Sequence, residues 1–324
     1  DAPEGNRPSI PRCSAFEFDE VSAAEPTEFE LYYRAGEHEY RYALSVHADE
    51  IVSEGLWRRK LGASRTAMLF EREGAEVELG PTLSKLVTAA RFNPRLPYLS
   101  FLCINFDVPV VKEAASWFLD GVFLNYNSSY LEQMLEQLLD EDDSTEVTRF
   151  LRAVDVRIDG FRVERAPEWR GQRVFVRHEV GGKAYELRLS EESAGTQKLM
   201  GLAAYLMTAL ERGGTVVVDE LDAKLHPKLL RYVILLFKDP EVNKSGAQLI
   251  FSSQDVSTMR NDVFRRDEIW FAARGEGEAS QLWSLADIHE ANGNLVSKNA
   301  AFDKQYLSGR YGADPYLTRI EEWD

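Results

Sequence analysis

Two adjacent carboxylates, Asp219 and Glu220, are the residues of this sequence best suited to chemistry. They follow an apolar run from Thr215 to Val218, and its β-branched residues are typical of a strand buried on both faces of a parallel sheet. Open α/β sheets bind their ligands at the carboxyl ends of their strands. Neighbouring acids at such an edge repel each other unless a cation neutralises them, so the pair predicts a site for Mg²⁺ and a phosphate ligand.

In the functional interpretation this segment is a Walker B element. Asp219 would hold Mg²⁺ through water, and Glu220 would orient or deprotonate the water that attacks a γ-phosphate. The alternative interpretation is a buried strand followed by acids that cap the next helix, because four apolar residues before Asp-Glu are a common string. The neighbouring segments favour the functional interpretation.

Two further segments could complete the site. Residues 193–197 form a polar, Gly-containing turn that opens into an apolar helix from Leu199 to Leu210. The free N–H groups and the positive dipole end at a helix start make an anion site, although in isolation the turn equally fits a well-capped buried helix. The run from Gln248 to Phe251 predicts another buried strand, and the polar residues 252–255 end it at the same kind of edge as Asp219.

Length and composition limit the class of protein. The 324 residues, 44% apolar and 11% aromatic, suffice for two domains with a sizeable core, and no apolar run approaches the roughly 18–20 residues that span a membrane. The net charge of −16 argues against broad binding to nucleic acid or anionic membranes, but leaves open a local basic patch or a basic partner. Cys13 and Cys103 lack ligand spacing, so we expect neither a disulfide scaffold nor a zinc site, and a cytoplasmic location.

The remaining pattern predicts three regions: an antiparallel β lobe over 1–81, a helical insertion over 82–155 and an α/β lobe over 156–324. The expected strands lie near residues 29–33, 40–46, 67–70, 162–189, 268–271 and 281–283, with turns at Gly36 and Gly74 and helices over 131–139 and from Pro227. The basic cluster from Arg58 to Lys60 fits a solvated strand edge better than a nucleic-acid site.

The sequence contains, in this order, a possible anion-binding helix start, two acids at a strand end and a polar strand end. This order resembles the C-terminal half of an ABC-type ATPase head, which contains a signature loop, a Walker B element, a D-loop and a switch. More narrowly, the strings SAGTQKL, VVDELDAKLHP, GAQLIFSSQD and GRYGA look like the prokaryotic AAA15 family, ATPases related to RecF, SMC and OLD proteins. The detailed match covers about residues 185–316. Many members of that family act in defence against phage, often beside an effector protein.

The resemblance implies a fold and a mode of action. The fold is an α/β, ABC-type (P-loop NTPase) ATPase head with an antiparallel β lobe and a helical insertion, and the chain works as a homodimer that binds ATP and Mg²⁺. Four residues would belong to the signature that closes on the γ-phosphate of ATP held by a second subunit; they are Ser193, Ala194, Gly195 and Thr196.

The resemblance also implies roles for single residues. Asp219 becomes the metal ligand and Glu220 the catalytic base, while Leu225 and His226 fall on the D-loop, which crosses the dimer interface. Gln254 occupies the catalytic switch position, where the family usually has His. Glutamine can hydrogen-bond a phosphate or water but cannot carry a proton, so this departure puts fast turnover in doubt.

A second departure concerns the phosphate cradle. The sequence contains no Gly-x-x-x-x-Gly-Lys-Ser/Thr, and Gly181-Gly182-Lys183 lacks both the upstream Gly and the hydroxyl residue. Since the chain begins at Asp1 rather than at Met, we expect the first strand, the P-loop and its helix to be missing from this sequence. A degenerate relative that does not hydrolyse ATP is the alternative. Asn105 is a weak candidate for the glutamine that couples the lobes.

The sequence therefore predicts an ATPase whose ATP-driven dimerisation gates a partner or effector protein in anti-phage defence. One alternative is a DNA-repair ATPase of RecF or SMC character that binds DNA directly; the net charge does not indicate nucleic acid, and salt-dependent DNA binding would favour this alternative. A second alternative is a nucleotide-sensing scaffold without hydrolysis.

Overall fold

The computed structural model describes residues 13–87, 91–125, 144–154, 156–165, 172–290 and 293–313 of the 324-residue chain. It forms two compact units, Asp1–Asp120 with Glu276–Ala279, and Gly121–Gly275 with Ser280–Asp324. The boundary after Asp120 falls inside the region 82–155 that we expected to be one helical insertion. The helix expected over 131–139 lies outside the described residues.

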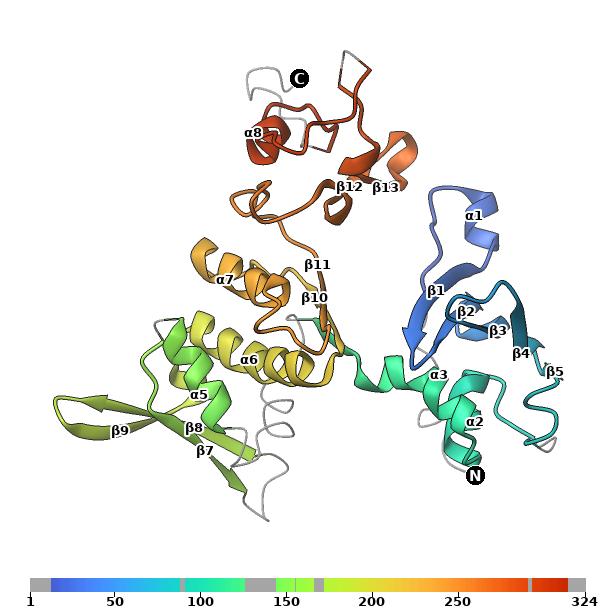
Figure 1. The fold of residues 1–324 in the computed structure, drawn as a ribbon, viewed down its shortest axis with the longest axis horizontal. Helices are drawn as coiled ribbons and strands as arrows, with labels where there is room; N and C mark the ends of the chain where they lie inside the picture. The colour runs from blue at the N-terminus through green and yellow to red at the C-terminus, as the bar shows by residue number, and fades with distance from the viewer. Residues whose placement is uncertain are drawn as a thin grey trace. The chain divides into compact units, whose positions relative to one another are not determined.

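The first unit is built on an antiparallel sheet with the strand order β1-β2-β3-β4-β5 (Figure 1). Its elements are α1 (Glu20–Ala24), β1 (Thr27–Ala35), β2 (His38–His47), β3 (Glu50–Lys60), β4 (Thr66–Glu73), β5 (Glu76–Leu79), α2 (Tyr98–Asn105) and α3 (Pro109–Asp120). The three predicted strands and the turns at Gly36 and Gly74, both with positive φ, are confirmed. Strand β3, which ends in the basic cluster, was not predicted. Arg59 of this cluster pairs with Glu39 of β2 at the solvated strand end.

Helices α2 and α3 pack on this sheet around a buried ion pair, Glu54 with Arg72, whose side chains are both 0% exposed. The Glu54 carboxylate accepts the N–H groups of Tyr98 and Leu99 at the start of α2 and the hydroxyl of Tyr42. The Arg72 guanidinium donates to Glu54 and to three backbone carbonyls. A carboxylate at a helix start also interacts favourably with the helix dipole, so the pair fixes α2 on the sheet.

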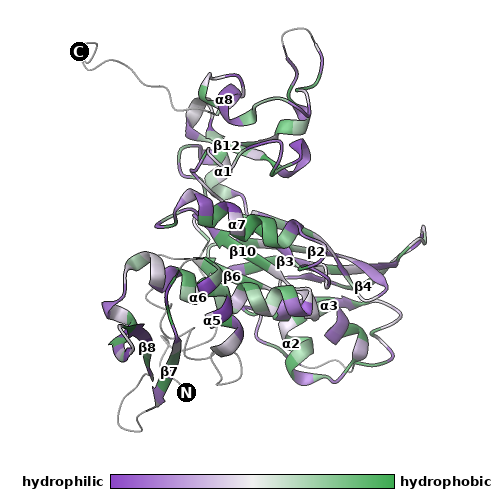
Figure 2. Ribbon diagram, turned by 60° about the vertical axis from the view of Figure 1, so that its left-hand side comes forward, coloured by the Kyte–Doolittle hydropathy of each residue, from purple (hydrophilic) through white to green (hydrophobic). Residues whose placement is uncertain are grey.

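The second unit contains a parallel sheet with the strand order β11-β10-β6. Its strands are β6 (Val122–Asn125), β10 (Thr215–Asp219) and β11 (Gln248–Phe251), and in Figure 2 β6 and β10 are coloured largely hydrophobic. Strands β10 and β11 were predicted. Strand β6 was not, because it lies in the region expected to be mostly helical and its short apolar run does not distinguish a strand from a buried helix.

Helices α5 (Ser144–Ala153), α6 (Ala194–Arg212) and α7 (Pro227–Lys238) share one apolar core with this sheet. Val216 and Val218 of β10 are 0% and 1% exposed in that core. Helix α6 ends at Gly213, whose φ of +83° is the left-handed conformation that glycine adopts most readily. The predicted helix starts at Ser193 and Pro227 are confirmed.

Two antiparallel sheets complete the second unit. The first consists of β7 (Gly160–Arg165), β8 (Gln172–Val180) and β9 (Lys183–Arg188), and the second of β12 (Trp270–Arg274) and β13 (Ser280–Ser284), beside α8 (Phe302–Leu307). Short 3-10 turns are η2 (Leu189–Glu191), η3 (Arg266–Glu268), η4 (Glu276–Glu278) and η5 (Leu285–Asp287). Among the described helices, none has the length and apolar character that crossing a membrane requires.

Candidate active site at the end of the parallel sheet

Strand β10 places Asp219 and Glu220 at the carboxyl end of the parallel sheet, beside the end of β11. The hydroxyl of Ser252, the residue after β11, donates to Asp219 Oδ1 at 2.5 Å and accepts the Glu220 N–H at 2.8 Å. Both acids are exposed, and within the described part of the chain the Glu220 carboxylate makes no hydrogen bond or ion pair. One serine therefore positions both acids and leaves the Glu220 carboxylate available to a ligand.

The acids do not cap the following helix. The cap of α7 is His226, whose Nδ1 accepts the N–H of Lys228 at 3.2 Å. The alternative interpretation of Asp219 and Glu220 as helix-capping residues is therefore wrong.

The turn between β10 and α7 has strained backbone. Glu220 and Lys224 adopt positive φ of 51° and 63°, which costs a residue other than glycine about 1–3 kcal/mol. Two hydrogen bonds close the turn, from the Ala223 N–H to the Glu220 carbonyl and from the Leu225 N–H to the Asp222 carbonyl. Strain of this kind persists only where the surroundings hold it, and it is concentrated at ligand sites.

Lys198 of α6 holds this turn. Its ammonium donates to the carbonyl oxygens of Glu220 at 2.9 Å, Leu221 at 3.0 Å and Ala223 at 2.6 Å, and the residue is 3% exposed. Burial lowers the pKa of Lys198 to about 8, while the nearby carboxylates of Asp222 and Glu220 act in the opposite direction. No role for Lys198 was predicted from the sequence, although a lysine at the start of an apolar helical run was a usable signal.

The predicted signature residues lie at the start of α6. Ser193 is the N-cap, and its hydroxyl accepts the N–H of Thr196 at 3.1 Å and lies 2.9 Å from the Thr196 hydroxyl. Ala194 follows as the first helical residue and is exposed. A Cβ on Gly195 would lie 3.1 Å from the carbonyl oxygen of Lys224, so a glycine allows the close approach of α6 to the strained turn.

Gln254 lies at the same edge of the sheet as the acids. Its N–H donates to Asp222 Oδ1 at 3.3 Å, and its side chain is exposed. The structure thus brings Asp219 and Glu220 together at Ser252. Gln254 follows two residues later and contacts the turn through Asp222.

Strand β6 contributes a position that the sequence analysis missed. Asn125 ends β6 and pairs in register with Asp219. Asn105, which we considered for lobe coupling, is instead the last residue of α2 in the first unit, where its amide donates to the Phe101 carbonyl of the same helix at 2.9 Å. Asn125 had no signal of its own, because the strand before it was not recognised.

The ligands at this edge are oxygen atoms. Across the described ranges, no three His, Cys, Asp or Glu side chains converge in a way that could hold a metal ion. The edge offers the Asp219 carboxylate beside the Ser252 hydroxyl. Mg²⁺ prefers oxygen ligands and is usually held by one or two carboxylates together with substrate phosphates and water. These residues therefore fit Mg²⁺ that arrives with a phosphate ligand.

Comparison with known proteins identifies the family of the chain. Residues 11–260 match the family described as "AAA domain, putative AbiEii toxin, Type IV TA system". The chain belongs to this AAA family. The match extends from the β lobe through the residues around Ser252, and it confirms the prediction of a chain from an AAA-type ATPase family. The predicted α/β class agrees with the parallel sheet and its packed helices. No curated protein matches the chain.

Solved structures similar to this AAA-family chain include heads of SMC ATPases. The Smc head bound to the C-winged helix domain of ScpA is 13% identical with a TM-score of 0.37, covering 77% of this chain and 74% of that one. The SMC head domain from Thermotoga maritima is 13% identical with a TM-score of 0.33, covering 77% and 74%. The Smc head from Pyrococcus furiosus, bound to the C-terminal domain of ScpA, is 13% identical with a TM-score of 0.33, covering 77% of both chains.

Proposed function

We propose that this AAA-family chain is the head of an ATP-dependent switch, in which Mg-ATP binding joins two subunits and hydrolysis releases them. The observation that carries the proposal is the position of Asp219 and Glu220. Ser252 holds both acids at the carboxyl end of a parallel sheet, and the Glu220 carboxylate is exposed and has no partner among the described residues. A base held at a ligand-binding edge is the arrangement that hydrolysis of a γ-phosphate requires.

Each residue at the edge then has a separate task. Asp219 would bind Mg²⁺, which when present neutralises charge on the β- and γ-phosphates. Glu220 would accept a proton from the attacking water, and Gln254 would hydrogen-bond the water or the γ-phosphate without carrying a proton. Lys198 would keep the acids in place through the backbone of the turn.

The signature residues would act on a second subunit. The first turn of α6, with Ser193, Ala194, Gly195 and Thr196, presents N–H groups and the positive end of a helix dipole. In a homodimer this turn would approach the γ-phosphate of ATP bound by the partner subunit, with His226 on the D-loop near the interface. Opening and closing of the dimer would then gate an effector protein.

The biological setting that we propose is anti-phage defence. The family description names an AbiEii toxin and a Type IV toxin–antitoxin system, and a system of two named components supports our proposal of a partner protein. The alternative is an ATPase that acts on DNA directly, and it predicts salt-dependent binding of DNA by the protein.

The test compares Glu220→Gln with Asp219→Ala in the full-length protein. Glu220→Gln keeps the shape and removes the base, so we expect retained Mg-ATP binding, an ATP-dependent dimer in sedimentation, and hydrolysis slower by about 10²–10⁴-fold. Asp219→Ala should lose the ATP-dependent dimer as well, because Mg²⁺ placement fails. Glu241→Gln, the same change at an exposed position beyond α7, is the matched control. Phosphate release equal to wild type in both acid variants contradicts the proposal.

A further inference from the structure

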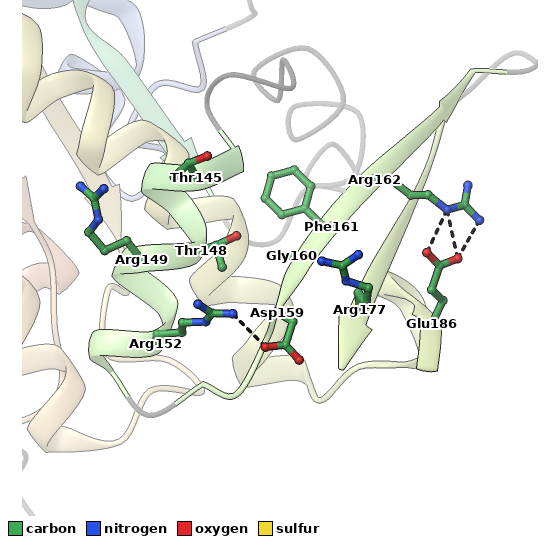
Figure 3. Close-up of a pocket in the computed structure, with 10 residues that line it drawn as sticks. All are labelled: Thr145, Thr148, Arg149, Arg152, Asp159, Gly160, Phe161, Arg162, Arg177 and Glu186. Atoms are coloured by element: carbon green, nitrogen blue, oxygen red, sulfur yellow. Dashed lines mark hydrogen bonds and ion pairs between the residues drawn. The ribbon is translucent and has the colours of Figure 1, made fainter. Parts of the chain in front are cut away.

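A cleft of about 470 Å³ lies between α5 and the sheet β7-β8-β9 (Figure 3). This volume is within the range of about 300–1,000 Å³ that is usual for ligand sites. The cleft shares no lining residue with the candidate active site. Four arginines, two carboxylates, two threonines, one aromatic ring and one glycine line it: Arg149, Arg152, Arg162, Arg177, Asp159, Glu186, Thr145, Thr148, Phe161 and Gly160.

Thr148 presents its hydroxyl to the cleft. The residue is 7% exposed, and Figure 3 shows its side chain directed from α5 into the cleft. Within the described ranges this hydroxyl makes no hydrogen bond. A threonine inside a helix commonly donates to the carbonyl one turn earlier, as Thr208 of α6 does to Ala204 at 2.9 Å. Thr148 therefore keeps its hydrogen-bonding capacity for a ligand.

Two guanidinium groups face the cleft from opposite walls (Figure 3). Arg152 of α5 is held in place by bonds from Nε to the Ile158 carbonyl at 3.0 Å and from Nη2 to Asp159 at 2.8 Å. Arg177 of β8 passes over Gly160, where a Cβ would lie 3.9 Å from its Nη2. In the described part of the chain the guanidinium of Arg177 makes no hydrogen bond or ion pair, and only its backbone is bonded, with the Asp159 N–H donating to its carbonyl at 2.8 Å.

The carboxylate nearest to Arg177 on the sheet is already engaged. Glu186 pairs with Arg162 at 2.9 Å, and this pair points away from α5 in Figure 3. The hydrogen bond from Arg162 lowers the pKa of Glu186, and the charge of Arg177 adds a smaller effect in the same direction. The guanidinium of Arg177 thus keeps its donors for an anion that enters the cleft.

These groups match the chemistry of a nucleotide. A phosphate monoester carries about −1.5 to −2 charge near pH 7, which suits two guanidinium groups and a hydroxyl better than the single charge of a carboxylate. Phe161 also lines the cleft; its ring is packed in part against the apolar core, and the part that stays exposed is an aromatic surface on which a base could stack. We propose that this cleft binds a nucleotide through its phosphate, either as a free nucleotide or as the phosphorylated end of a single nucleic-acid strand. The site goes beyond the ATPase function and does not depend on it.

The test is calorimetric titration of the full chain with inorganic phosphate, adenosine monophosphate and a 5′-phosphorylated single-stranded oligonucleotide. Arg177→Gln should weaken binding of the monophosphate by about 10- to 100-fold, and Thr148→Val by about 2- to 10-fold. Lys183→Gln removes one positive charge from the same sheet outside the cleft and should leave the affinity unchanged. Monophosphate bound at the sheet edge around Asp219 would be insensitive to these cleft variants.

Two outcomes support the site and identify its ligand. Similar affinity for the monophosphate and the oligonucleotide assigns it to free nucleotides, whereas tighter, salt-dependent binding of the oligonucleotide assigns it to strand ends. The proposal is overturned if no probe binds saturably, if inorganic phosphate binds as tightly as the monophosphate, or if both cleft variants bind like Lys183→Gln. Thr148→Val is nearly isosteric and keeps the test valid if Arg177→Gln does not fold.

Discussion

Replacing Lys198 by methionine tests how α6 holds the turn behind the two acids. The ammonium makes three hydrogen bonds to backbone carbonyls, those of Glu220, Leu221 and Ala223, at 2.6 to 3.0 Å. Methionine fills a similar volume and keeps the apolar stem, but it offers no donor. The variant therefore leaves three carbonyl oxygens without this partner and removes the positive charge near Asp222 and Glu220.

The expected loss of stability follows from these contacts. A hydrogen bond with a charged partner contributes about 1.5–3 kcal/mol, so three of them set a ceiling of roughly 5–9 kcal/mol. Burial of the ammonium offsets part of this gain, and the pKa of Lys198, lowered to about 8, reflects that cost. Some carbonyls also regain water in the variant. We expect the free energy of unfolding of the second unit to fall by about 2–4 kcal/mol, a large effect for one substitution.

Hydrogen exchange of the turn is the decisive assay. The N–H groups of Ala223 and Leu225 donate within the turn, and in Lys198→Met we expect them to exchange faster while the sheet of the first unit is unchanged. Denaturant midpoints give the loss of stability. Lys228→Met, at an exposed lysine of α7, is the matched control. If the two variants show equal exchange and equal midpoints, Lys198 does not hold the turn and the reasoning fails.

Three further predictions concern Ser252, the buried ion pair of the first unit and the pKa of Lys198. Ser252→Ala removes the hydroxyl that contacts both Asp219 and Glu220. We expect the free energy of unfolding to fall by ~1–2 kcal/mol and phosphate release by the full-length protein to slow. Unchanged phosphate release would show that Asp219 does not need the hydrogen bond from Ser252. Glu54→Ala leaves the buried Arg72 guanidinium without its carboxylate partner. Thermal unfolding should show that the free energy of unfolding of the first unit falls by about 3–5 kcal/mol. A melting curve equal to that of wild type would contradict the stabilising role of this ion pair. Burial lowers the pKa of Lys198 from its ordinary value of 10.5 to about 8 in the folded protein, so the unfolded chain retains this proton to higher pH. The stability of wild type relative to Lys198→Met should therefore increase as the pH rises from 8 to 10.5, and a constant difference between denaturant midpoints across this range would count against the lowered pKa.

The elements that carry the site could be predicted from local sequence patterns. The β-branched run of residues 215–218 predicted β10, the serine before an apolar helix predicted the start of α6, and Pro227 predicted the start of α7, and the structure confirms all three. These signals are local, because strand preference, a cap hydrogen bond and the fixed φ of proline each act within a few residues. The ATPase superfamily was also predicted from short strings and is confirmed by the family match.

The contacts around Asp219 and Glu220 could not be predicted from the sequence, because they join segments far apart in the chain. Lys198 contacts carbonyls 22 to 25 residues away in the sequence, and Ser252 contacts Asp219 across 33 residues. The sequence pattern near Lys198 or Ser252 therefore does not predict these contacts. Strand β6 is four residues long, and its apolar run became recognisable as a strand only through pairing with β10. The cleft beside Thr148 likewise exists only where α5 meets the sheet β7-β8-β9. Local residue preferences determine which segments form helices and strands. The contacts around the acids and the cleft form only when segments distant in sequence pack together, so a short stretch of sequence does not predict them.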